Sequence, residues 1–334
     1  MNQHTAMKLK RWLYIVPAFL LACTSCGYSE DPITPSGNYS VLRFDFPQGN
    51  NDFDKEIEQI HDEYGFYVIY KDITLQDLNR KWTSVGTDNT YYGNDVPDAD
   101  MPFYVSFLKE RILEYMDVDM VKKTFPIKFY FMENFRAIPY GMPDQPYPWE
   151  GEGYGDNVSP YFQALKTNGF DYWAMSLKRS QMENTNPTAS KQLQCAVLFQ
   201  LILQCKESGV VSEPAALRDG IDFETRFPYG VGTDDPNHPY RRGFINWIYD
   251  DFGTSNRLHL IEDNGPIYLS YYQTGGSRDY FMDYVKAAMW YTRDEFVAKY
   301  PTEQFPLITE KFDIVVDYFN NTVGIDLQGI AEGK

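Results

Sequence analysis

Histidine is scarce in this chain, which contains only four among 334 residues. His61, His238 and His259 lie far apart in the sequence, and none has a second histidine four positions away. Zinc hydrolases with an H-E-x-x-H helix need two imidazoles at that spacing, because only then do both face the same ion. A G-x-S-x-G turn for a serine nucleophile is also missing. The sequence therefore predicts no catalytic residue, no set of metal ligands and no cofactor.

Basic residues are also few, with 30 Lys and Arg against 47 Asp and Glu, and the formal net charge is −17. Binding to nucleic acid requires a basic stripe or patch that can neutralise phosphates. The one candidate for such a stripe, the pair Arg241-Arg242, is flanked by four acids, at positions 234, 235, 250 and 251. The composition therefore excludes nucleic acid as an expected partner.

Two of the four cysteines follow a short apolar run at the N-terminus. Lys8, Lys10 and Arg11 precede the run from Trp12 to Ala22, which is shorter than the roughly 20 residues that span a bilayer. Leu20 to Cys23 resembles the recognition sequence of the lipoprotein signal peptidase, and Cys26 offers a second cleavage point. An uncleaved anchor or an ordinary secretory signal with an incidental cysteine is the alternative.

From this segment we expect a lipoprotein signal and lipidation site over residues 1–26, with Cys23 favoured over Cys26. A tether over 27–38 follows, because this stretch mixes charge, proline and glycine and offers little to bury. The expected location is the outer membrane, anchored through lipid, at the cell surface.

The other two cysteines, Cys195 and Cys205, lie ten positions apart in one apolar stretch that reads as helical. A helix would separate their Cα atoms by about 15 Å, beyond the roughly 7 Å limit for a disulfide. We therefore expect two buried free thiols.

Apolar residues make up 43% of the chain and aromatic residues 17%, enough for a large core. Periodicity predicts helices over 54–64, 102–116, 119–123, 188–206, 277–291 and 305–320, and a short one after the capping-box pattern of 292–295. Strands are expected near 41–46, 66–71, 127–132 and 171–177. The fold class is therefore α+β in a single domain over 39–334, with a small mixed sheet in 39–185 and a mostly helical part in 186–334.

Two segments have the composition of functional loops. Residues 84–101 are dense in Asp and Asn, and the hard oxygen ligands of Asp88 to Asp100 suggest calcium, although the EF-hand order is absent. The second segment, 136–160, contains Tyr140, Tyr147, Trp149 and Tyr154, whose rings could stack on sugars, with Tyr161 and Trp173 nearby in sequence. Packing of these rings against the core is the alternative. Glu150 and Glu152 are candidates for a glycosidase pair only if they lie about 5–9 Å apart.

Several stretches share patterns of residue types with a known family, namely 54–68, 72–81, 114–116, 122–131, 279–290 and 318–327. In these stretches the chain resembles the substrate-import-associated zinc metallohydrolase lipoproteins, which occur beside SusC/SusD-type nutrient importers in Bacteroidetes. The resemblance implies a zincin-like scaffold. It also implies an H-E-x-x-H motif on the central helix and a third ligand, a Glu, on a later helix.

At the corresponding positions this chain lacks the ligands. Val197 to Leu201 stand where H-E-x-x-H is expected, and Asp283 occupies the third-ligand position. Val197, Leu198, Leu201 and Asp283 are therefore interpreted as a degenerate metal site. The resemblance then implies a non-catalytic surface lipoprotein accessory to nutrient uptake, with importer components as partners and a glycan or peptide as ligand.

Three alternatives remain open. The chain could be a carbohydrate-binding or carbohydrate-cleaving module that uses the loop aromatics. It could be an active zinc hydrolase if the alignment is displaced. It could also be a hydrolase of unrecognised type, for which Asp171, Asp283, Glu224 and Tyr229 are candidates.

Overall fold

The computed structural model describes residues 42–80, 89–139, 163–228, 231–245 and 279–333. The chain divides into two compact units, residues 1–43 and residues 44–334. The predicted signal, Cys23, Cys26 and the tether lie outside the described residues. The architecture below is that of the second unit.

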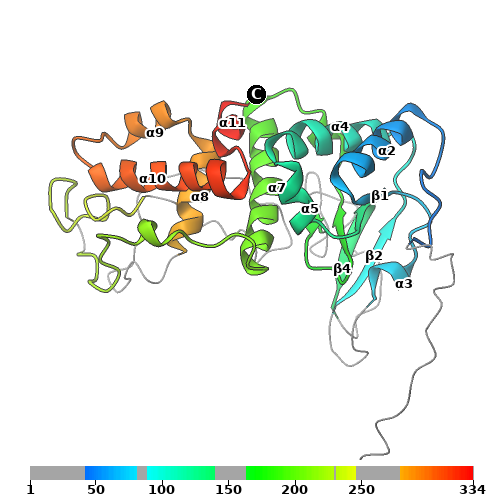
Figure 1. The fold of residues 1–334 in the computed structure, drawn as a ribbon, viewed down its shortest axis with the longest axis horizontal. Coiled ribbons are helices and arrows are strands. Elements are labelled where there is room, and N and C mark those ends of the chain that lie inside the picture. Colours follow the sequence, from blue (N-terminus) through cyan, green and yellow to red (C-terminus); the bar gives the residue numbers. More distant parts are fainter. Residues whose placement is uncertain (1–41, 81–88, 140–162, 229–230, 246–278, 334) are drawn as a thin grey trace, which may run out of the picture. The chain divides into compact units, whose positions relative to one another are not determined.

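A four-stranded mixed sheet forms the N-terminal part (Figure 1). Strands β1 (Tyr67–Ile69), β3 (Lys128–Phe131) and β6 (Tyr172–Met175) run parallel, and β5 (Leu165–Lys166) pairs antiparallel with β6. Both faces of β3 and β6 are buried, as expected of parallel strands with continuous apolar sequence. Phe129 and Trp173 face the main core, whereas Tyr130 and Tyr172 face a second, smaller cluster. The small mixed sheet predicted from the sequence is confirmed.

Helices α2 (Asp52–Tyr64), α4 (Met101–Arg111) and α5 (Val118–Thr124) accompany this sheet. Helix α2 begins where the Asp54 carboxylate accepts the Asn51 N–H at 2.8 Å, and it ends at Gly65 in the left-handed region with φ 84°. Glycine adopts that conformation without a steric penalty, which explains the stop read from the sequence.

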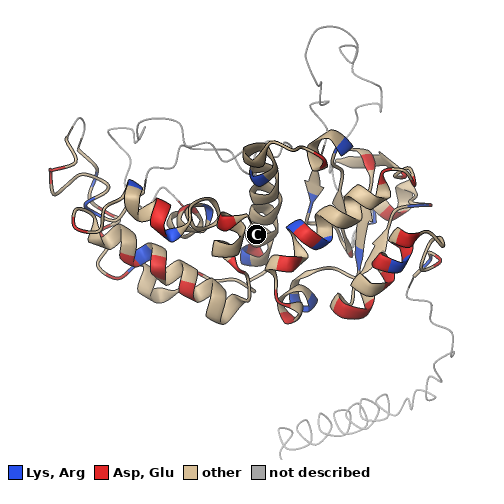
Figure 2. Ribbon diagram, turned by 90° about the horizontal axis from the view of Figure 1, so that it is seen from above, with Lys and Arg blue, Asp and Glu red and all other residues tan. Residues whose placement is uncertain are grey.

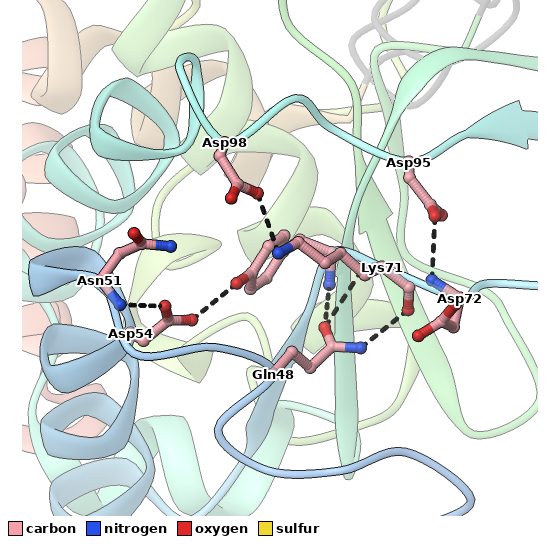
Figure 3. A network of polar contacts seen from close by, with 8 residues as sticks. Gln48, Asn51, Asp54, Lys71, Asp72, Asp95 and Asp98 are labelled. Atoms are coloured by element: carbon pink, nitrogen blue, oxygen red, sulfur yellow. Dashed lines mark hydrogen bonds and ion pairs between the residues drawn. The ribbon is translucent and has the colours of Figure 1, made fainter.

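The structure corrects two predictions in the same part. The expected loop over 84–101 contains β2 (Thr90–Asn94), which pairs antiparallel with β4 (Glu133–Ile138). The expected strand near 41–46 is absent, since residues 42–46 form bends and coil. The side chain of Gln48 takes the pairing positions instead: its Oε1 accepts the N–H of Tyr70 and of Lys71, and its Nε2 donates to the Lys71 carbonyl (Figure 3).

The central helix α7 (Pro187–Glu207) follows the short helix α6 (Arg179–Met182). The Asn186 side chain accepts the N–H groups of Thr188 and Ala189, and Pro187 occupies the first turn, so the helix begins close to the predicted residue 188. Buried residues surround the helix, and Figure 1 shows it between the sheet and the C-terminal helices. Within the described residues, no helix has the length and apolarity needed to cross a membrane.

The C-terminal part is helical, as predicted. It contains α8 (Tyr280–Trp290), α9 (Arg293–Lys299), α10 (Pro306–Tyr318) and α11 (Leu327–Glu332), with α10 and α11 packed on α8. Helix α9 begins at the predicted capping box, in which Thr292 and Glu295 exchange backbone and side-chain hydrogen bonds. Short helical turns at Leu75–Leu78 (α3), Leu113–Tyr115, Ala215–Leu217 and Phe319–Val323 complete the described elements. Figure 2 shows acidic and basic residues interspersed along the ribbon of both parts.

Candidate functional site

The positions interpreted as a degenerate metal site lie in the main core. Val197, Leu198 and Leu201 on α7 are at most 1% exposed, and Asp283 on α8 is half-buried. Hydrocarbon side chains offer no atom to a cation, and here they are packed among other apolar groups. Among the described residues, no group of three or more His, Cys, Asp and Glu lies close enough together to hold a metal ion.

The two cysteines of α7 are buried free thiols, as predicted. The Cys195 Sγ contacts the Met289 carbonyl at 3.6 Å, and burial raises the pKa of this thiol to about 12. Burial likewise raises the pKa of Cys205 to about 11. Both therefore stay protonated at neutral pH and are unsuited to nucleophilic chemistry.

The described histidines have structural contacts. The ring of His61 stacks on Tyr67 with centroids 4.0 Å apart, and its Nδ1 lies 3.3 Å from the Phe66 carbonyl. The Nδ1 of His238 accepts the Tyr240 N–H at 3.2 Å. His259 lies outside the described residues.

The acidic segment is paired with protein donors. Asp95 accepts the backbone N–H of Asp72 at 2.9 Å, and Asp98 forms an ion pair with Lys71 at 2.9 Å (Figure 3). Asp100 lies 3.5 Å from the Arg179 guanidinium. Asp88 is outside the described residues. Asp95 and Asp98 attach the segment after β2 to the segment after β1, Asp100 contacts α6, and these acids do not converge on a cation site.

The aromatic candidates Tyr140, Tyr147, Trp149 and Tyr154 lie outside the described residues, as do Tyr161, Glu150 and Glu152. Trp173 is described, and it is not an exposed platform. It is 5% exposed on β6, with its ring centroid 4.7 Å from that of Phe125. The suggestion that Trp173 stacks on a ligand is wrong, because parallel pairing with β3 directs it into the core.

A pocket of about 500 Å³ opens beside the free edge of the sheet, between the α3–β2 region and the β5–β6 connection. Among the residues that the structure describes, its lining combines two cations, three asparagines and three aromatic rings, and none of them is an Asp or Glu. The residues are Leu78, Asn79, Arg80, Asn89, Tyr91, Lys166, Asn168, Gly169, Phe170 and Tyr172. A pocket of this size and composition suits a small polar ligand that also has an apolar face.

Lys166 is the most unusual residue of this pocket, because its side chain is charged yet only 8% exposed. It stands opposite Ala174 in the β5–β6 pair, which places it on the face of the second aromatic cluster. Its ammonium lies 4.0 Å from the centroid of the Tyr91 ring and donates to Asn168 Oδ1 at 2.6 Å. Burial lowers the pKa of Lys166 to about 8. Among the described residues, no carboxylate forms an ion pair with it.

Arg80 reaches the same pocket from the other side and is held by Asp171. The Asp171 Oδ2 accepts Arg80 Nη1 at 3.1 Å and Lys128 Nζ at 2.7 Å. Asp171 Oδ1 is buried without a hydrogen-bond partner among the described groups. Asp171 was a candidate for hydrolysis, and the structure shows it as the counter-ion of two cations.

The pocket walls are fixed by hydrogen bonds and close packing. The Asn79 side chain both accepts from and donates to the Tyr91 backbone, and the Tyr172 hydroxyl donates to the Leu78 carbonyl at 2.5 Å. A Cβ at Gly169 would lie 2.2 Å from the Tyr172 carbonyl oxygen, so only glycine fits there. Phe170, next to it, is 48% exposed. An exposed aromatic ring thus lies at the rim of this polar pocket.

Sequence reasoning missed this pocket; Asp171, a candidate from the sequence, only borders it through its contact with Arg80. Its described residues come from 78–80, 89–91 and 166–172, and pairing across the sheet brings them together. Asn168-Gly169-Phe170 was a possible local signal, since an exposed Phe in a polar turn is unusual. The other hydrolase candidates do not join it: Glu224 is exposed in a loop, Asp283 is on α8, and Tyr229 is outside the described residues.

No protein-family model matches the sequence, and no curated protein matches it significantly. The fold is similar to a crystal structure described as that of "a putative zinc-binding metallo-peptidase" from Bacteroides caccae. The likeness covers 86% of this chain and 92% of the other, with a TM-score of 0.41 and 11% sequence identity. At this level of likeness no family membership follows.

Proposed function

We propose that this chain is a non-catalytic, lipid-anchored surface protein that binds a saccharide in the pocket beside Lys166, as an accessory to nutrient uptake. The observation that carries the proposal is the composition of that pocket. Asparagine amides and cationic groups hydrogen-bond sugar hydroxyls, and an exposed ring such as Phe170 packs against the apolar face of a sugar. The zincin-like scaffold and the importer partners belong to the proposal through the resemblance read from the sequence.

The pocket chemistry supports binding over cleavage. Glycoside hydrolysis uses two carboxyl groups that flank the scissile bond, one of them as a general acid. The lining residues in the described part of the chain include neither Asp nor Glu, and the neighbouring Asp171 already pairs with Arg80 and Lys128. The hydrocarbon side chains at 197, 198 and 201 support the same conclusion for zinc-dependent hydrolysis, because none of them can ligate a metal.

A glycan array probed with the full chain, purified in detergent, tests the proposal. We expect retention of a saccharide and at least about tenfold weaker binding by Phe170→Ala, since the variant loses the stacking surface. Val210→Ala is the matched control, because Val210 is also an exposed apolar side chain but lies outside the pocket. Absence of any retained saccharide, or equal binding by Phe170→Ala, would contradict the assignment.

Metal analysis of the same preparation tests the non-catalytic part. One tightly held zinc per chain, together with peptide or glycan cleavage that a chelator abolishes, would overturn it. We expect cleavage to be undetectable in both the wild type and Asp283→Asn.

A further inference from the structure

We propose that the saccharide is acidic, and that Lys166 and Arg80 together bind its anionic group. This inference rests on the proposed function, and it specifies the ligand of the same pocket. A carboxylate, as in a uronic acid, and a sulfate ester share the chemistry that the two cations would recognise.

The first argument is the unbalanced charge of the pocket. The chain as a whole has a net charge of −17, yet the described lining residues include two cations and no acid. A buried charge is costly unless a group of opposite sign approaches it. The Lys166 ammonium has a neutral amide and an aromatic ring as its described partners. An anionic ligand would supply the missing counter-charge.

The second argument is the arrangement of Arg80. Its contact with Asp171 uses Nη1, whereas a guanidinium carries five N–H donors in a planar fork. Asp171 also receives Lys128 on the same oxygen, so the carboxylate is shared between two cations. Arg80 is thus positioned by Asp171, and its contacts with described residues leave donors for a second, bidentate partner. Its side chain is 49% exposed, so a ligand from solvent can reach it.

The third argument is that the remaining lining suits the sugar ring and its hydroxyls. Asn89 and Asn168 contribute amides, and Phe170 contributes an exposed ring. The Tyr91 ring is engaged by Lys166, which holds the ammonium at the pocket wall. A small inorganic anion would satisfy the cations and leave these groups unused. The lining as a whole therefore favours a charged saccharide over a simple anion.

Titration calorimetry on the full chain tests the inference with matched probes. These are a trisaccharide of uronic acid residues, its neutral hexose counterpart, a sulfated trisaccharide and sodium acetate. We expect at least one acidic trisaccharide to bind about tenfold or more tightly than the neutral one. Lys166→Met and Arg80→Gln should each bring the two affinities to within a factor of about 3 of each other. Val210→Ala should keep the wild-type ratio.

The outcomes separate the inference from the proposed function. Equal affinity for neutral and acidic trisaccharides overturns the acidic ligand and leaves saccharide binding standing. Acetate binding as tight as the acidic trisaccharides overturns the saccharide part. Binding by none of the probes, together with an empty glycan array, overturns both. Circular dichroism shows whether Lys166→Met folds. If it does not, Arg80→Gln still tests the inference, because the Arg80 side chain is half-exposed and its replacement should leave the fold intact.

Discussion

The Lys166 ammonium lies 4.0 Å from the centroid of the Tyr91 ring, although the two residues are 75 positions apart in the sequence. This contact joins β5 of the mixed sheet to β2 of the separate two-stranded sheet. It places a cation at the wall of a pocket in an acidic protein. A buried lysine held by a ring and an amide opposes stability, which suggests a role in binding.

Replacement of Lys166 by methionine should stabilise the protein at neutral pH. The pKa of Lys166 is lowered from 10.5 to about 8 because burial disfavours its charged form. The charged Lys166 therefore destabilises the folded state. This loss of free energy is greatest below about pH 8, and it disappears as the pH rises toward 10.5. We expect Lys166→Met to raise the free energy of unfolding by about 1–2 kcal/mol at pH 7, after subtraction of the lost contacts with Tyr91 and Asn168.

Urea unfolding at pH 7 and pH 9.5 measures this effect, and the gain should shrink at the higher pH. Lys55→Met is the control, since Lys55 is an exposed lysine on α2. If Lys166→Met is less stable than the wild type at pH 7, buried Lys166 does not destabilise the folded state.

Affinity for an acidic saccharide should fall as the pH rises above about 8, because Lys166 then loses its charge. The other groups that face it are the Arg80 guanidinium and the phenols of Tyr91 and Tyr172, with Asp171 and Lys128 paired beyond Arg80. Burial raises the pKa of Tyr172, so its phenol stays neutral in this range. Calorimetry between pH 7 and 9.5 should show a loss approaching about tenfold per pH unit. An affinity that does not change with pH would show that Lys166 does not bind the anionic group of the ligand.

Gly169→Ala should distort the pocket. The added Cβ would lie 2.2 Å from the Tyr172 carbonyl oxygen, so the β5–β6 connection must shift. We expect a loss of about 1–3 kcal/mol in the free energy of unfolding, together with weaker saccharide binding. Gly232→Ala is the control, because a Cβ there meets no atom within 4 Å. Equal denaturation midpoints for the two variants would contradict the close contact between residue 169 and the Tyr172 carbonyl oxygen.

Leu198→Ala should lower the free energy of unfolding by about 3 kcal/mol, because Leu198 is 0% exposed in the main core. Leu203→Ala on the same helix should cost about 1 kcal/mol, since Leu203 is half-buried. Urea denaturation compares the two. If Leu198→Ala costs less than Leu203→Ala, the central helix borders an open cavity, and the assignment of its face to the core is wrong.

Local signals predicted the helices well. Asn186-Pro187, Gly65 and the Thr292–Glu295 pair each start or end a helix through contacts within four residues, so the sequence contains the whole cause. The burial of Cys195 and Cys205 also follows from their surroundings on one apolar helix. Amphipathic spacing and caps act over short distances, and these features therefore follow from the sequence alone.

Tertiary structure alone decided the rest. Strands β2 and β4 pair although about 40 residues separate them in the sequence. Where a strand was expected near 41–46, the side chain of Gln48 instead accepts hydrogen bonds from the backbone of Tyr70 and Lys71. Lys166, Arg80 and Phe170 meet only because β5 pairs with β6 in one register and Asn79 holds β2 beside them. The free energy that selects such pairings comes from burial and hydrogen bonds between distant segments, and no local pattern of residues encodes it.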